Sequence, residues 1–356
     1  MTDMSTTKDR PILLDVKGLK TYFFQRRGVL KAVDGVNFTV RAGESVGLVG
    51  ESGSGKSMTC LSIMRLVPKP AASIVDGQIL FNGEDLLGIQ ESEMREYRGS
   101  KIAMVMQDPQ TSMNPVFTIG NQVEEPIKLH LKERGAQAMQ RALDALRSVR
   151  IPSPEDRLKQ YPHQFSGGMK QRATIALAMS LSPRLIIADE PTTALDVLVQ
   201  ARILDLLRDL KKKLGLTLIY ITHDLSVASQ TCDFLGVMYA GELVEFGPTK
   251  QVLSGPFHPY TMGLVSAVPR RSMLEWEPVS IPGAPPDLLQ EPEGCRFVER
   301  CPFAANRCAK ESTHLLSCAE FHQAACHYID RADTMRKESQ AAEIWETSLA
   351  GRSKSI

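Results

Sequence analysis

Short apolar runs alternate with helical patterns over the first two thirds of the chain. Strands that alternate with helices in this way indicate a mixed α/β domain with a largely parallel sheet. The predicted strands are Ile12 to Val16, Val36 to Val40, Val46 to Val49, Leu185 to Ala188, Leu216 to Ile221, Phe234 to Met238 and Leu243 to Phe246.

The pattern becomes mostly helical from about Leu86 to Leu181, which predicts a helical subdomain over residues 86–181. Apolar residues recur there at the three- and four-residue spacing of one helix face. They are Ala138, Met139, Ala142, Leu143, Ala145, Leu146 and Val149.

The alternation of strands and helices ends after about Gly247. A proline-rich stretch then predicts an extended segment, because proline fits poorly into helices and sheets; its prolines are Pro278, Pro282, Pro285, Pro286 and Pro292. The charged tail from about Arg331 is expected to be partly disordered. The expected organisation is a large domain over 12–255, a small C-terminal module over 256–330 and a tail over 331–356.

Composition and charge exclude two classes of protein. The 356 residues include 42 Lys and Arg against 41 Asp and Glu, a net charge of +1, which argues against a protein held on nucleic acid mainly by phosphate neutralisation. The sequence has no run of about 18 apolar residues, the length that a membrane-spanning helix needs. Residues Met1 to Arg10 also lack the apolar stretch of a signal peptide, so the chain is expected in the cytosol.

Residues Gly50 to Ser57 match the pattern of a phosphate-binding loop (P-loop), between a predicted strand and an apolar helix pattern. Glycines let backbone N–H groups approach a polyphosphate closely, and the following helix directs its positive dipole end at the anion. Lys56 is suited to the outer phosphates and the Ser57 hydroxyl to Mg²⁺. The residues expected to contact the nucleotide here are Gly50, Ser52, Gly53, Gly55, Lys56, Ser57 and Met58.

Two carboxylates, Asp189 and Glu190, end the apolar run Leu185 to Ala188. Asp189 is suited to hold Mg²⁺, and Glu190 to polarise an attacking water molecule. Together with the P-loop they predict a nucleoside triphosphatase.

The sequence Ser166-Gly167-Gly168 resembles the signature of ATP-binding cassette (ABC) proteins, where a helix start offers a second anion site. This resemblance implies a role for Gln107 in sensing Mg²⁺ and the attacking water. It also implies that Ala194-Leu195-Asp196 crosses the interface of an ATPase dimer, and that His223 contacts the γ-phosphate. Phe23, or its neighbour Tyr22 in the aromatic run that ends at Phe24, is the residue expected to stack on adenine.

Three further segments are similar to the ATPases of dipeptide and oligopeptide importers: Met106 to Pro115, Tyr161 to Gln164 and His258 to Thr261. The likeness covers about residues 12–330. Phe165 replaces the usual Leu, and Cys318 has no evident counterpart.

Five of the seven cysteines lie close together near the C-terminus, which suggests a metal site in a reducing compartment. Cys295, Cys301, Cys308 and Cys326 have the spacing C-x5-C-x6-C-x17-C, without the short pair common in zinc modules. Thiolates also bind iron–sulfur clusters, so the spacing does not choose the metal. The family resemblance implies a [4Fe–4S] cluster, with zinc as the alternative and Cys318 as a bystander.

The expectation from the whole sequence is the ATP-hydrolysing subunit of a peptide-class importer, an α/β P-loop ATPase using ATP and Mg²⁺. The resemblance implies two membrane permease subunits, a second ATPase that is a paralogue or, alternatively, another copy of this chain, and, indirectly, an extracytoplasmic solute-binding protein. The chain would then lie on the cytoplasmic face of the membrane. The alternative is a soluble cassette ATPase that acts on ribosomes or nucleic acid.

Overall fold

The computed structural model describes residues 10–108, 112–193, 195–268, 280–290 and 293–350. The chain divides into two compact units, which are taken in turn. The first unit comprises Met1–Leu13, Val40–Ser45 and Glu84–Ile221, and the second comprises Leu14–Thr39, Val46–Gly83 and Thr222–Ile356.

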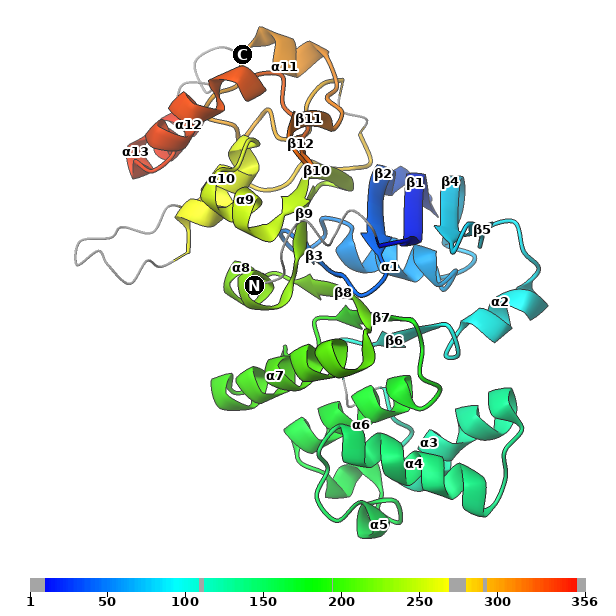
Figure 1. The fold of residues 1–356 in the computed structure, drawn as a ribbon. Coiled ribbons are helices and arrows are strands. Elements are labelled where there is room, and N and C mark those ends of the chain that lie inside the picture. The colour runs from blue at the N-terminus through cyan, green and yellow to red at the C-terminus, as the bar shows by residue number, and fades with distance from the viewer. Residues whose placement is uncertain (1–9, 109–111, 194, 269–279, 291–292, 351–356) are drawn as a thin grey trace. The chain divides into compact units, whose positions relative to one another are not determined.

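Three parallel strands run through the first unit (Figure 1). Strand β7 (Leu185–Asp189) pairs with β6 (Ile102–Val105) on one side and with β8 (Thr217–Thr222) on the other. Every residue of β7 and β8 is buried, as expected for parallel strands covered on both faces. A short strand, β5 (Glu84–Asp85), opens the segment.

Helices make up most of the remaining first unit. They are α2 (Glu91–Tyr97), α3 (Ile119–Pro126), the π-helical turn η2 (Ile127–Leu131), α4 (Ala136–Ser148), α5 (Pro154–Arg157), the 3₁₀ turn η3 (Pro162–Gln164), α6 (Gly167–Met179) and α7 (Val197–Leu214). The predicted apolar face is that of α4, where Ala138, Ala142 and Leu146 are buried, whereas Met139 is 51% exposed. The stretch 86–181 thus holds α2 to α6, and it also contains strand β6, which the sequence pattern did not reveal.

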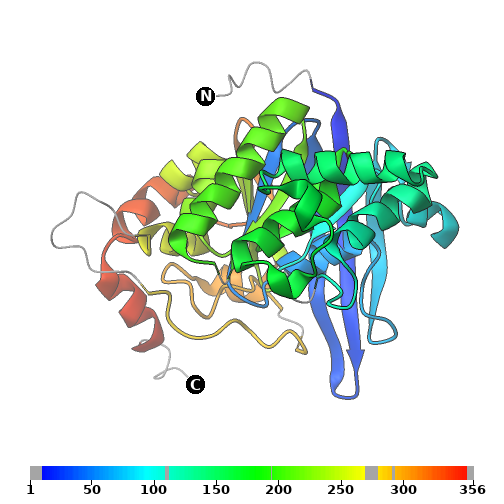
Figure 2. The same ribbon diagram turned by 90° about the horizontal axis from the view of Figure 1, so that it is seen from below.

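Two sheets form the frame of the second unit. In one, β1 (Ile12–Gln25) lies between β2 (Gly28–Arg41) and β4 (Ala72–Phe81), and β1 and β2 form the long hairpin seen in Figure 2. In the other, β3 (Ser45–Val49) pairs in parallel with β9 (Phe234–Tyr239). Antiparallel strands then follow in the order β10 (Glu242–Pro248), β12 (His322–Ala324) and β11 (Leu316–Ala319).

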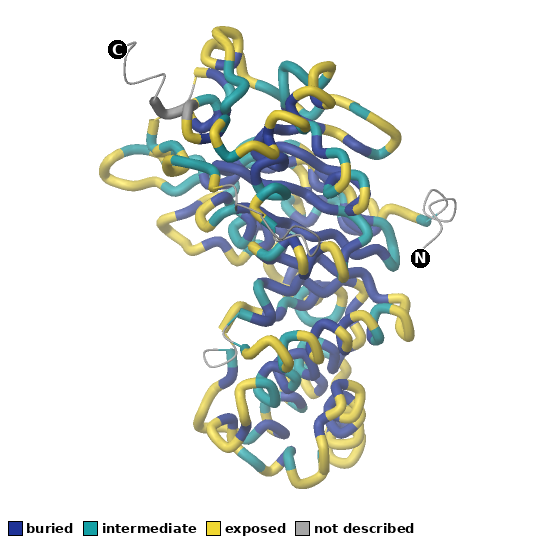
Figure 3. The backbone as a smooth tube through the Cα atoms, turned by 90° about the vertical axis from the view of Figure 1, so that its left-hand side faces the viewer, coloured by how far each residue is buried: buried dark blue, intermediate teal, exposed yellow. Residues whose placement is uncertain are grey.

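Short helices accompany these strands: α1 (Lys56–Ile63), α8 (Leu225–Thr231), α9 (Thr249–Ser254), α10 (Pro259–Ser266), α11 (Asn306–Lys310), the 3₁₀ turn η4 (Ile329–Arg331), α12 (Ala332–Glu338) and α13 (Ala342–Ala350). All seven strands predicted from the sequence are present, and β1 is longer than expected. Figure 3 colours the backbone by burial, and every residue of β3, like those of β7 and β8, is buried. Among the described residues, no helix is both long and apolar enough to cross a lipid bilayer.

The C-terminal region does not form a separate module, contrary to the expectation from the sequence. Tyr260, Phe297 and Trp345 belong to the same buried cluster as Val49 of β3 and Val237 of β9. The region therefore shares the hydrophobic core of the second unit. The described prolines from Pro282 to Pro286 lie outside helices and strands, as predicted, and Pro278 and Pro292 lie outside the described residues.

The tail expected to be partly disordered is helical over α12 and α13. Trp345 is 1% exposed, and its indole N–H donates a hydrogen bond to the Ser339 carbonyl oxygen at 3.0 Å. Met335 is also buried, against Met262. The prediction failed because it weighed the charged residues and overlooked these apolar ones. Residues 351–356 lie outside the described part of the chain.

Candidate active site

The P-loop follows β3 and leads into α1, and two of its glycines are required by close backbone contacts. Gly50 has φ 149°, and a Cβ atom there would lie 2.1 Å from the Met238 carbonyl oxygen. Gly55 has φ 101°, and its Cβ atom would lie 2.5 Å from the Ala32 carbonyl oxygen. Because both the positive φ and the lack of space exclude a side chain, only glycine fits at either position.

The ammonium group of Lys56 lies inside this loop. It donates hydrogen bonds to the carbonyl oxygens of Gly50 and Glu51, both at 2.8 Å, and to Ser54 Oγ at 3.3 Å. Lys56 is 6% exposed, so its charge is held within the curve of the loop. Ser57 and Met58 are half-buried in the first turn of α1, while Ser52 and Gly53 are exposed on the loop.

The two predicted carboxylates stand at the end of β7. Asp189 is 6% exposed and ends the strand. Glu190 has φ 43°, a left-handed conformation that is uncommon for a residue other than glycine. Its N–H donates to the Ile221 carbonyl oxygen of β8 at 3.1 Å. Backbone strain of this kind is typical of functional sites.

Gln107 reaches Glu190 from the segment after β6. Gln107 Nε2 donates a hydrogen bond of 3.1 Å to Glu190 Oε2. Thr193 Oγ1 donates to the same oxygen at 2.8 Å, a contact that no sequence pattern indicated. The parallel pairing of β6 with β7 brings the two strand ends together, so Gln107, Asp189 and Glu190 lie near one another in the first unit. The neighbouring residues Pro109 to Thr111 lie outside the described residues.

The signature and the predicted interface loop each begin a helix. Ser166 precedes α6, and its Oγ accepts a hydrogen bond from Met169 N–H at 3.4 Å; Gly167 and Gly168 form the first turn. Asp196 precedes α7, and its Oδ1 accepts from Val199 N–H at 2.9 Å. Both polar side chains therefore stabilise helix N-termini. Ala194 lies outside the described residues.

His223 and the aromatic residues belong to the second unit. His223 is exposed directly after β8. Phe23 and Tyr22 are half-buried on β1, and Phe24 is 52% exposed. Tyr22 donates its hydroxyl to Asp34 Oδ1 at 2.6 Å, while the Lys31 ammonium lies 5.7 Å from the centre of its ring. The choice between Phe23 and Tyr22 as the adenine-stacking residue stays a prediction.

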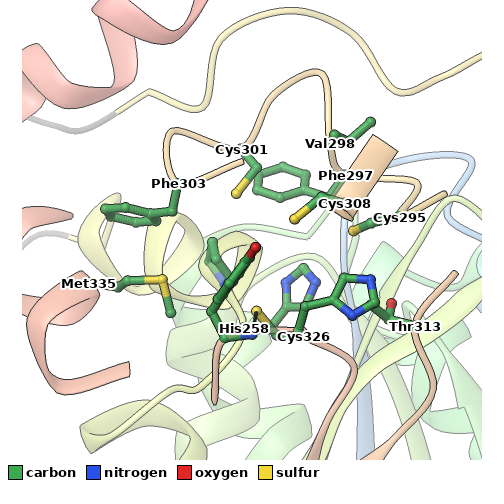
Figure 4. A pocket seen from close by; sticks show the side chains of 13 residues that line it. His258, Cys295, Phe297, Val298, Cys301, Phe303, Cys308, Thr313, Cys326 and Met335 are labelled. Carbon is green, nitrogen blue, oxygen red and sulfur yellow. Dashed lines mark hydrogen bonds between the residues drawn. The ribbon is translucent and has the colours of Figure 1, made fainter. Parts of the chain in front are cut away.

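The four cysteines predicted to act together line a single small cavity, together with His258 and other residues (Figure 4). Gly294 permits this arrangement, because a Cβ atom there would lie 2.2 Å from the Cys308 carbonyl oxygen. Cys295 N–H donates to that oxygen at 2.8 Å, which ties two of the cysteine positions together. Cys318 is not among the residues that line the cavity.

The cavity offers four sulfur donors for a thiolate-bound group, but the thiol pKa values and the available space do not favour one. Burial raises the pKa of Cys295 to about 11 and of Cys326 to about 12, and it also raises the pKa of Cys301. The space between the side chains is about 20 Å³, room for about one water molecule, so a cluster would require them to move apart. Within the described part of the chain, no three His, Cys, Asp or Glu side chains are grouped closely enough to hold one metal ion. Four sulfur donors are thus present, but not in the arrangement of a zinc site.

Comparison with known proteins agrees with this geometry. Residues 33–193 match the family model described as ABC transporter, and residues 244–308 match that of the oligopeptide/dipeptide transporter C-terminal region. The chain is also similar to solved structures. A dimeric, post-hydrolysis structure of the ATP-binding cassette MJ0796 bound to ADP and Pi is 28% identical, covers 66% of this chain and 98% of its own, and has a TM-score of 0.59.

Curated relatives match over most of their length. A probable peptide ABC transporter ATP-binding protein, y4tR of Sinorhizobium fredii, is 48% identical over 91% of this chain and 97% of that protein. The oligopeptide transport ATP-binding protein OppD of Bacillus subtilis is 47% identical over 82% of each chain. The dipeptide transport ATP-binding protein DppD of Escherichia coli is 44% identical over 89% of this chain and 96% of its own. These relatives do not favour the alternative of a soluble ATPase of ribosomes or nucleic acid. The chain is therefore an ABC ATPase and belongs to the family of ATP-binding proteins of peptide ABC transporters.

Proposed function

We propose that this chain hydrolyses ATP to power the import of dipeptides, oligopeptides or a related solute. The observation that carries the proposal is the match of residues 244–308 to the C-terminal region of oligopeptide and dipeptide transporters, in addition to the cassette match. The relatives named for peptide transport support it, because they align along almost the whole chain.

In this proposal the predicted residues divide the catalytic work among them. Lys56 neutralises the outer phosphates, while Ser57, Asp189 and Gln107 bind or sense Mg²⁺. Glu190 orients and polarises the attacking water, and the hydrogen bond from Gln107 fixes its carboxylate. His223 contacts the γ-phosphate, and Phe23 stacks on adenine.

A second ATPase, which we propose to be a paralogue, completes the nucleotide sites. Ser166, Gly167 and Gly168 at the start of α6 face the nucleotide of the partner, and Asp196 lies at the interface between the two ATPases. Closure of the two ATPases on ATP, followed by hydrolysis, would drive the conformational cycle of the transporter.

Two permease subunits supply the membrane pore, and an extracytoplasmic binding protein delivers the solute to them. An exposed apolar patch on the first unit supports a permease contact: Val116 and Leu129 are each 71% exposed, and Phe117 is 50% exposed. These three residues lie just before and just after α3, and we call them the α3 patch. Beside it lies a cavity of about 520 Å³, lined by Phe117, Gln122, Glu125, Lys128 and Leu129, among others. Its mixed apolar and charged lining suits a cytoplasmic helix of a permease, which would place the chain on the cytoplasmic face of the membrane.

Uptake of a labelled di- or tripeptide by cells tests the proposed function. Cells that lack this chain should lose uptake, wild-type chain should restore it, and the Glu190→Gln variant should not. Affinity purification from detergent-solubilised membranes should recover two permeases and a second ATPase. Recovery of ribosomes without membrane subunits would instead support the soluble alternative.

We further propose that Cys295, Cys301, Cys308 and Cys326 bind a [4Fe–4S] cluster. The convergence of the four cysteine side chains on one cavity supports it, because four thiolates are the usual ligand set of such a cluster. Anaerobic purification should give brown protein with about four iron atoms per chain, the content of one such cluster. Colourless protein that contains zinc would refute the cluster.

A further inference from the structure

Glu51, the second residue of the P-loop, is held by residues from the C-terminal region. Its N–H donates a hydrogen bond to the Tyr260 hydroxyl oxygen at 2.9 Å. Its carboxylate accepts two hydrogen bonds from Arg300: Nη1 lies 2.8 Å from Oε2, and Nη2 lies 3.0 Å from Oε1. Both the backbone and the side chain of one loop residue are thus fixed from outside the loop.

Arg300 is itself fixed from its other side. Nε donates to the Pro282 carbonyl oxygen at 2.8 Å, and Nη2 donates to the Ile281 carbonyl oxygen at 3.3 Å. Nη1 also contacts the Tyr239 hydroxyl at 3.3 Å. Arg300 is 4% exposed, and a planar guanidinium held at this many points can present both N–H groups to a carboxylate in one orientation.

The partners of Glu51 rest on a compact aromatic cluster. The rings of Tyr239 and Tyr260 have their centres 4.6 Å apart, and the Phe297 ring lies 5.2 Å and 5.4 Å from them. Tyr239, Tyr260 and Phe297 are each at most 1% exposed. The support behind the loop is therefore well packed and buried. The Arg300 side chain is 5% exposed and that of Glu51 is 28% exposed, so their ion pair is stronger than one fully in water.

A second arginine of the same segment contacts residues near the aromatic run of β1. Arg296 forms an ion pair with Asp34 and another with Glu242 at 3.0 Å. Asp34 in turn accepts the Tyr22 hydroxyl, so the segment of Arg296 and Arg300 contacts the surroundings of both the P-loop and the aromatic run of β1.

We infer that Arg300 and Tyr260 are positioning residues of the P-loop, and that they set the affinity for ATP by fixing Glu51. Neither residue needs to touch the nucleotide. Without Arg300 the Glu51 carboxylate would be left partly buried with its charge uncompensated, and the loop would move to hydrate it. The inference depends on ATP binding by this chain and not on the solute, so it stands or falls separately from peptide import.

ATP binding to the purified full-length chain tests the inference, measured with Mg²⁺ and a fluorescent ATP analogue. Arg300→Ala should raise Kd by about tenfold, and Tyr260→Phe and Glu51→Gln should raise it by less, since each removes a smaller part of the contact. Arg300→Lys keeps the charge but not the two-pronged geometry, so its Kd should lie between those of the wild type and Arg300→Ala. In steady-state hydrolysis the KM for ATP should rise more than kcat falls.

Arg307→Ala is the matched control. Arg307 is only seven residues away and pairs with Glu311 at 2.7 Å, but both side chains are more than half exposed. This variant should bind ATP like the wild type. A double-mutant cycle adds a second readout: Glu51→Ala with Arg300→Ala should weaken binding no more than the stronger single substitution.

If Arg300→Ala folds, two results would overturn the inference. In the first, Arg300→Ala lowers the melting temperature while ATP affinity stays at the wild-type value, which would make Arg300 a structural residue only. In the second, the effects of Glu51→Ala and Arg300→Ala on binding add. If Arg300→Ala does not fold, unchanged affinity in both Arg300→Lys and Glu51→Gln, which preserve most of the side-chain volume, would refute it equally.

Discussion

Gln107 and Glu190 are 83 residues apart in the sequence, and in the structure Gln107 Nε2 donates a hydrogen bond of 3.1 Å to Glu190 Oε2. The contact exists because β6 and β7 run side by side in the same direction and end at the same edge of the sheet. It leaves one carboxylate oxygen of Glu190, Oε2, shared by Gln107 and Thr193.

Replacement of Glu190 by Gln should abolish turnover and spare ATP binding. A general base contributes about 10²- to 10⁴-fold, so steady-state hydrolysis should fall by at least two orders of magnitude. Glutamine can still accept the hydrogen bonds of Gln107 and Thr193, so the local geometry should persist. A phosphate-release assay and an ATP-binding titration separate the two effects. Hydrolysis at the wild-type rate would show that Glu190 is not the base.

Gln107→Ala should slow hydrolysis by about tenfold, less than Glu190→Gln, because it removes one hydrogen bond to a charged group. Thr193→Val removes the other donor to the same oxygen and should also slow turnover. The same phosphate-release assay measures both. If neither substitution altered the rate, the orientation of the Glu190 carboxylate would not depend on these donors.

A charge introduced into the α3 patch should uncouple the ATPase from its membrane partners. Val116→Asp should reduce the recovery of permeases in a pull-down by about tenfold or more, since a buried charge in an apolar contact is costly. The basal ATPase activity of the purified chain should not change. Leu214→Asp is the matched control, because Leu214 is also apolar and 59% exposed in the first unit but lies at the end of α7. Equal recovery of permeases with the two variants would exclude the patch as the contact.

Cys326→Ser should lower the iron content of anaerobically purified protein, whereas Cys318→Ser should leave it unchanged. The reason is positional: Cys326 lines the cavity, and Cys318 does not. Iron analysis and the visible absorption spectrum measure the outcome. A loss of iron of the same size in both variants would contradict this assignment of ligands.

Trp345→Ala should destabilise the chain by about 3–5 kcal/mol, the usual cost of removing a large buried aromatic side chain. Leu316→Ala, at a position that is 51% exposed in the same unit, should cost less than about 0.5 kcal/mol. Urea denaturation followed by circular dichroism compares the two. Equal midpoints would mean that α13 does not contribute to the core.

The sequence was informative where function depends on residues close together in the chain. The spacing of the glycines was enough to predict the P-loop. The structure explains the need for glycine at Gly50 and Gly55, where backbone contacts exclude a side chain. Glu190 could be predicted because it directly follows a buried apolar strand. The same local reasoning located the four cysteines that share a cavity.

Features that depend on distant partners could not be read from the sequence. Arg300 lies 249 residues from Glu51, and nothing in its local pattern distinguishes it from an exposed arginine. Strand β6 is only four residues long and lies within a helical stretch, so its apolar residues fit either pattern. The burial of Trp345 was missed because the sequence analysis considered only the charged residues of the tail.

The segment from Cys295 to Cys301 places a cysteine beside each of the two arginines, Arg296 and Arg300, that reach Asp34 and Glu51. The C-terminal region therefore cannot be replaced at the end of the cassette sequence without regard to residues Asp34 and Glu51. A chimera that takes residues 256–350 from a relative would need compatible residues at positions 34 and 51, more than 200 positions earlier in the chain, or it would inherit arginines without their carboxylates. In the design of hybrid transporter ATPases, the two carboxylates and the C-terminal region should be taken from the same protein.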